Sequence, residues 1–66
     1  MPNFTKTAIK TSFMKLLNEY PLSKISVRSI VEDCGINRNS FYYHYQDIPT
    51  LIEEIIKQEV DGLIAT

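Results

Sequence analysis

The residues best suited to chemistry in this 66-residue chain are six polar or aromatic side chains close together. In a helix they point outward, while Phe41 and Tyr45, four residues apart, face inward. Arginine and asparagine can each grip a purine base with two hydrogen bonds, serine bonds several bases, and an aromatic ring can contact the thymine methyl. Tyrosine and histidine donors suit phosphate oxygens. The cluster predicts a surface that reads double-stranded DNA through Arg38, Asn39, Ser40, Tyr42, Tyr43 and His44.

A second set of candidate contacts precedes this cluster. Ser26 and Arg28 lie at the start of a short predicted helix, where the first helix of a helix-turn-helix motif crosses the sugar-phosphate backbone. Lys24 lies just upstream and adds a positive charge. A base-edge contact and a phosphate contact both remain open for Arg28.

The sequence offers few residues suited to catalysis or metal binding. Cys34 is the only cysteine and His44 the only histidine, so neither a disulfide nor a set of zinc ligands is expected. His44 also lacks an evident partner for general-base chemistry. We therefore expect no enzyme, no metal and no cofactor.

Three predicted helices position the candidate surface, over residues 5–19, 27–34 and 38–45. Ile9, Phe13, Leu16 and Tyr20 recur at helical spacing in the first, and Pro21 ends it. The second and third begin after good N-caps, Ser26 and Asn37, and Gly35 supplies the turn between them. Two short helices around a glycine-containing turn indicate a helix-turn-helix, so residues 1–46 are predicted to form an all-α, three-helix DNA-binding domain.

Residues 47–66 are predicted to begin a fourth, connecting helix. Asp47 is its N-cap, and Pro49 is tolerated in the first turn. The apolar stripe is wider than so small a domain needs, which predicts that the helix leads to a ligand-binding and dimerisation domain absent from this chain. The stripe comprises Leu51, Ile52, Ile55, Ile56, Val60, Leu63 and Ile64.

Composition and charge fit a globular DNA-binding head. The chain is 44% hydrophobic and 23% charged, and we expect neither a secretion signal nor a membrane span, hence a cytoplasmic protein. The net charge of -1 conceals an asymmetry. Six basic residues stand against three acidic ones in residues 1–46, and one against five in residues 47–66. The basic excess lies in the segment predicted to bind DNA.

The chain resembles the TetR-type bacterial regulators in two segments. The first runs from Ile25 to Val31, and the second runs from Cys34 through Gly-Ile-Asn to Phe-Tyr-Tyr-His-Tyr. The likeness covers nearly the whole chain, and the run ending in Gln-Asp-Ile is similar to the branch with dihydroxyacetone-kinase regulators. The resemblance implies a homodimeric transcription regulator, such as a repressor, on a palindromic operator, with a small-molecule effector bound in the C-terminal domain. It assigns DNA contacts to Arg28, Arg38, Asn39, Ser40, Tyr42, Tyr43 and His44, with Tyr42 and His44 on phosphates.

One departure and one alternative accompany this interpretation. The family often has lysine just after the cap of the fourth helix, where Ile48 and Pro49 stand here, so one phosphate contact is missing. The alternative is a small protein-interaction module that docks a partner through the apolar stripe of residues 51–64. Salt-dependent duplex binding would distinguish the first function from the second.

Overall fold

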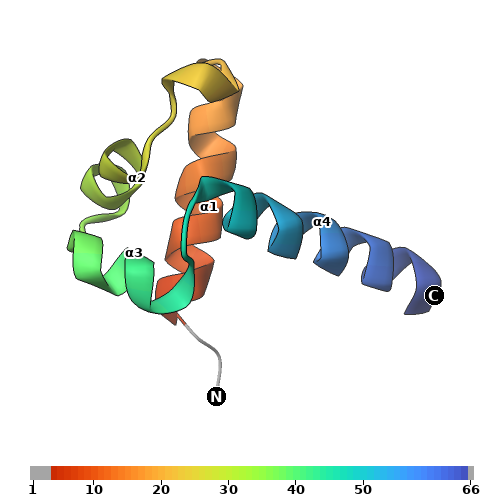
Figure 1. Cartoon of the computed structure of the whole chain (residues 1–66). Helices are drawn as coiled ribbons and strands as arrows, with labels where there is room; N and C mark the ends of the chain where they lie inside the picture. The colour runs from red at the N-terminus through yellow and green to blue at the C-terminus, as the bar shows by residue number, and fades with distance from the viewer. Residues whose placement is uncertain (1–3, 66) are drawn as a thin grey trace.

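The structure is a computed structural model that describes residues 4–65, with side chains described as far as residue 62. Within that part the chain is all-α, with helices α1 (Phe4–Glu19), α2 (Val27–Cys34), α3 (Arg38–His44) and α4 (Ile48–Ala65), and a short 3-10 turn η1 (Leu22–Lys24). Helices α1, α2 and α3 pack together, and α4 projects from this head on the side away from α2 and α3 (Figure 1). The predicted all-α, three-helix head with a fourth helix is confirmed.

The helix boundaries follow local signals. The Ser26 side chain accepts a hydrogen bond from the backbone N–H of Ser29, and the Ser29 hydroxyl accepts one from the N–H of Ser26, which completes a capping box. Gly35 ends α2 with φ of 75°, a left-handed conformation that glycine adopts without a Cβ penalty. Both predicted signals are confirmed.

The caps of the last two helices also agree with the prediction. Asn37 Oδ1 accepts from the N–H of Ser40 at 2.8 Å, and Asp47 Oδ1 accepts from the N–H of Thr50 at 2.8 Å. Helix α3 ends at His44, one residue earlier than predicted, because Tyr45 is extended (φ -138°, ψ 134°) and acts as the C-cap. Helix α1 begins at Phe4 rather than at residue 5.

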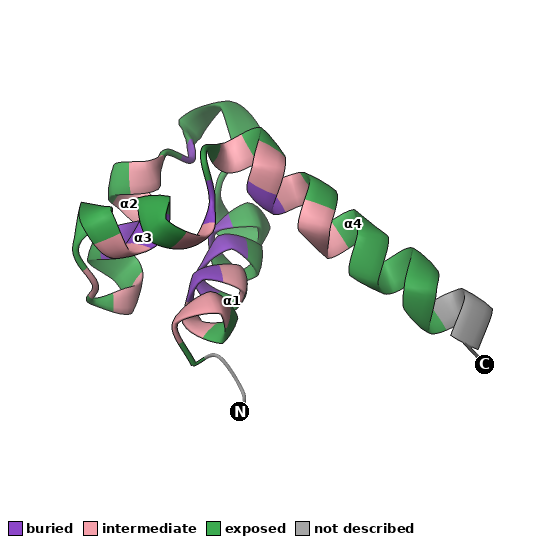
Figure 2. Ribbon diagram, turned by 60° about the horizontal axis from the view of Figure 1, so that its bottom comes forward, coloured by how far each residue is buried: buried purple, intermediate pink, exposed green. Residues whose placement is uncertain are grey.

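The core lies where the three head helices meet the first turn of α4. Phe41 is fully buried at its centre, and the band of buried residues along the inner faces of the helices is visible in Figure 2. The core consists of Ile9, Phe13, Leu16, Ile25, Ile30, Val31, Phe41, Tyr45 and Leu51. One buried side chain is polar: the Ser12 hydroxyl lies 2.6 Å from Asp33 Oδ2 and 3.3 Å from the carbonyl oxygen of Ile30, which joins α1 to α2.

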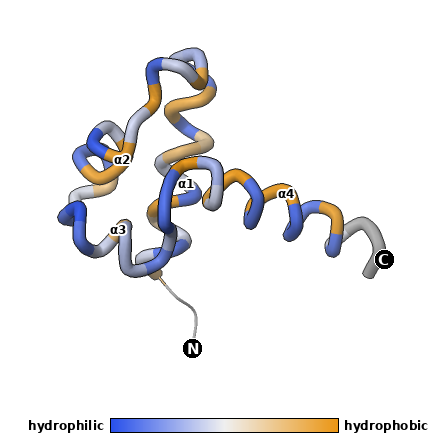
Figure 3. The backbone as a smooth tube through the Cα atoms, in the orientation of Figure 1, coloured by the Kyte–Doolittle hydropathy of each residue, from blue (hydrophilic) through white to orange (hydrophobic). Residues whose placement is uncertain are grey.

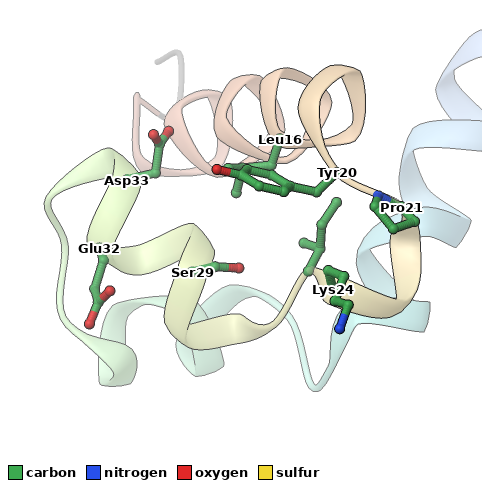
Figure 4. Close-up of a pocket in the computed structure, with 8 residues that line it drawn as sticks. Leu16, Tyr20, Pro21, Lys24, Ser29, Glu32 and Asp33 are labelled. Atoms are coloured by element: carbon green, nitrogen blue, oxygen red, sulfur yellow. The ribbon is translucent and has the colours of Figure 1, made fainter.

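Some apolar residues of α1 and α4, and Tyr20 after α1, are exposed. Tyr20 is 51% exposed because it follows the last turn of α1, and its ring lies in a groove between α1 and α2 that Leu16, Ile25 and Ser29 help to line (Figure 4). Leu17, Ile56 and Val60 are also exposed. The side chains of Leu63 and Ile64 lie outside the described residues.

Helix α4 alternates apolar and polar residues along its length (Figure 3). Among the described residues, its first half supplies the apolar contacts with the head: Leu51 is fully buried, Ile52 and Ile55 are partly buried, and residues 56–62 are exposed. Among the described residues, no helix combines the length and apolar character that crossing a bilayer requires.

Candidate nucleic-acid interface

The outer face of α3 forms the candidate interface. Phe41 fixes the helix from beneath, with its ring centroid 5.9 Å from that of Tyr45. Arg38, Asn39 and Tyr43 point the other way, and Tyr43 is 85% exposed. The outward face is therefore free of other described parts of the chain, as entry into a major groove requires.

Aromatic contacts order the neighbouring rings on α3. The Tyr42 ring meets Phe41 edge to face at a centroid distance of 5.5 Å, and the rings of Tyr43 and His44 meet likewise at 5.0 Å. Such contacts restrict the rotamers of Tyr42 and His44 while leaving their polar atoms at the surface. Ordered aromatic side chains lose less conformational entropy on binding a partner than free ones would.

A shallow hollow extends this surface onto α1. It is lined by residues from α3 and its N-cap together with one residue of α1, namely Asn37, Asn39, Ser40, Tyr43, His44 and Thr5. Thr5 was not among the sequence candidates. Its proximity to α3 depends on the packing of α1 across the bundle, and no local pattern in the sequence reports that packing.

Most cations of the head are paired with carboxylates of the same chain. Lys15 Nζ lies 2.8 Å from Asp33 Oδ1, and this pair, together with the hydroxyl of Ser12, holds the pKa of Asp33 below its usual value. Lys6 and Lys10 both pair with Glu54. Within residues 4–46, the cations without an ion pair to another described residue are Lys24 and Arg38.

Arg28 lies on the exposed face of α2 and pairs with Glu32 one turn later, Nε to Oε1 at 3.0 Å. Both side chains are largely exposed, so water and salt weaken the pair, and a phosphate could replace the carboxylate. Ser26 is exposed at the start of the same helix, but its hydroxyl is occupied with the capping box. The structure therefore brings Ser26 and Arg28 to one end of α2 and leaves only Arg28 with a side chain free to change partners.

Comparison with known proteins decides the family. A sequence model of the bacterial regulatory proteins of the tetR family matches residues 13–55, from the middle of α1 to the first half of α4. The chain belongs to the TetR family. It is also 29% identical, over 63 residues and 96% of its length, to the uncharacterized HTH-type transcriptional regulator YxbF of Bacillus subtilis. No solved structure matches the chain significantly.

The match to the tetR family confirms the family resemblance and supports a DNA-binding regulator head. The chain spans only 17% of the length of the YxbF relative. The match to the family includes the turn at Gly35, all of α3 and the cap of α4, which are the parts that present the candidate interface.

Proposed function

We propose that this TetR head binds double-stranded DNA sequence-specifically, with α3 as the recognition helix in the major groove. The observation that carries the proposal is the division of α3 into a buried anchor, Phe41, and an exposed face that bears Arg38, Asn39 and Tyr43. Arginine and asparagine near the N-terminal end of a recognition helix are placed to read guanine and adenine. Residues 4–46 form the reading unit and α4 the connection.

The remaining contacts are assigned by position. Ser40 and Tyr43 accompany the base-reading residues, Tyr42 and His44 bind phosphates, and Thr5 extends the phosphate surface from α1. Arg28 and Ser26 contact the DNA from the start of α2. A homodimer formed through a C-terminal domain, with an effector bound there, would place two such heads on a palindromic operator, with half-site centres about 34 to 36 Å or a multiple apart.

Selection of duplexes from a random pool, followed by affinity measurement on the enriched sequence, tests the proposal. Arg38→Ala and Tyr43→Ala should each weaken binding about 5- to 150-fold, since a lost base contact costs about 1–3 kcal/mol. Asn18→Ala, an exposed change on α1 away from α3, is the matched control and should have no effect. A pool without an enriched sequence, or unchanged affinity in both variants, would refute the assignment of α3.

One observation favours a second function, the docking of another protein. A wholly apolar groove runs between α1 and α4, lined by Phe13, Met14, Leu17, Leu22, Ile52, Ile55 and Ile56. A docking module would bury this groove against a partner and leave the duplex affinity of the chain unaffected by Arg38→Ala. The α3 variants above therefore distinguish the two functions.

A further inference from the structure

Four polar side chains from three segments meet where α4 leaves the head. Glu54 of α4 accepts a hydrogen bond from the hydroxyl of Tyr45, the C-cap of α3. Lys6 Nζ lies 3.0 Å from Glu54 Oε1, and Lys10 Nζ lies 3.3 Å from Glu54 Oε2. One carboxylate thus joins α4 to both α1 and the end of α3.

The cluster attaches α4 to the three-helix head by polar contacts, in addition to its apolar packing. Leu51 is the only fully buried side chain among the described residues of α4, and everything from Ile56 to Gly62 is exposed. Ile48, Ile52 and Ile55 also pack against the core but are only partly buried, so the apolar contacts of α4 with the head end at Ile55. The bonds to Glu54, one turn further along, supply additional points of attachment, and Lys10 also donates to Gln58 Oε1 at 2.8 Å.

Tyr45 connects this attachment rigidly to α3. Its ring is 2% exposed, and its backbone N–H donates to the carbonyl oxygen of Phe41 at 2.9 Å. The Tyr45 hydroxyl holds the pKa of Glu54 down, to about 2, with Lys6 and Lys10 contributing. Burial and the same hydrogen bond raise the pKa of Tyr45. The proton therefore stays on the tyrosine and the carboxylate stays charged at neutral pH.

We propose that Glu54 is a positioning residue that sets the direction of α4 relative to the three-helix head and couples α4 to α3. The inference rests on the proposed function only in that α3 is taken as the recognition helix. A reorientation of α4 would then have to break the bonds to Lys6 and Lys10 or pull on Tyr45, and through Tyr45 on Phe41.

Residual dipolar couplings of backbone amides, measured on the 66-residue chain, test the proposal without DNA. In the parent chain the α4 couplings should fit the same alignment as those of α1 to α3. Glu54→Gln removes both ion pairs, and Tyr45→Phe removes only the hydroxyl. In each variant the α4 couplings should shrink and no longer fit, while those of α1 to α3 stay unchanged.

Glu53→Gln is the control, because it removes the same charge from an exposed neighbouring position. Its couplings should match those of the parent. Unaltered α4 couplings in Glu54→Gln and Tyr45→Phe would overturn the proposal, and so would loss of the α1 to α3 fold in Tyr45→Phe, since the hydroxyl would then serve folding rather than direction. Because no duplex is present, failure here is distinguishable from failure of DNA binding.

Discussion

At the scale of single residues, the sequence predicts those roles that depend on neighbouring residues. Ser26, Gly35 and Asn37 have the predicted roles because a cap or a left-handed turn depends on neighbours within three residues. The sequence does not identify Glu54 as an attachment point, because its partners Lys6 and Lys10 lie 48 and 44 positions away in the sequence. Only the fold brings these residues of α1 close to Glu54. The DNA contacts themselves remain predictions drawn from side-chain chemistry.

The exposed pair of Arg28 and Glu32 leads to the prediction that a substitution strengthens DNA binding. An exposed pair of this spacing stabilises a helix by only about 0.3–0.5 kcal/mol, whereas Glu32 both occupies Arg28 and repels phosphate. Glu32→Gln should therefore strengthen duplex binding a few-fold at low salt, as measured by fluorescence anisotropy. Glu19→Gln, which removes an exposed carboxylate from α1, is the control. Weaker binding by Glu32→Gln would argue against a DNA contact by Arg28.

At the scale of elements, α2 and α3 were predicted well because each has its own start and stop signals. The 3-10 turn η1 was missed, since Pro21 was taken only as the end of α1. Tyr20 continues the helical spacing of Phe13 and Leu16, but α1 ends at Glu19, and Tyr20 is exposed. In α4 the sequence pattern alone does not distinguish the buried first half from the exposed second half, because both carry the same spacing.

Two neighbouring asparagines should separate the stability of α3 from its function. Asn37 caps the helix, so Asn37→Ala should lower the free energy of unfolding by about 1 kcal/mol. Asn39 is exposed and makes no side-chain hydrogen bond among the described contacts, so Asn39→Ala should leave stability unchanged and weaken binding to the selected duplex. Urea unfolding followed by circular dichroism measures the first effect. Equal stability of the two variants would contradict the capping role.

The turn between α2 and α3 depends on one backbone conformation. An alanine Cβ at Gly35 would meet no atom within 4 Å, so the cost of Gly35→Ala comes from the left-handed φ alone, about 1–2 kcal/mol. Gly62→Ala is the matched control in helical backbone and should be neutral or mildly stabilising. Thermal unfolding of both variants measures the difference, and an unchanged midpoint for Gly35→Ala would refute the strain.

At the scale of the whole molecule, carboxylates tie the helices together, which makes stability depend on pH. The pKa of Glu54 is lowered from 4.5 to about 2, so its contribution is complete above about pH 4.5 and disappears as the pH falls toward 2. Asp33, paired with Lys15 and Ser12, acts in the same direction.

Unfolding free energies measured from pH 6 to pH 2 should therefore decline, and the decline should be shallower in Glu54→Gln than in the parent. Glu53→Gln, at an exposed position outside the ion pairs of the described residues, should retain the full slope. An identical slope in Glu54→Gln would mean that the hydrogen bond from Tyr45 does not favour the ionised carboxylate.

The internal pairing of lysines has a consequence for how the head would find its target. With Lys6, Lys10 and Lys15 engaged by carboxylates of the same chain, few counterions are displaced when the head meets an arbitrary stretch of duplex. Residence on bulk chromosomal DNA should then be brief and sliding short. Discrimination between sequences would then depend more on close fit at the target than on long-range attraction.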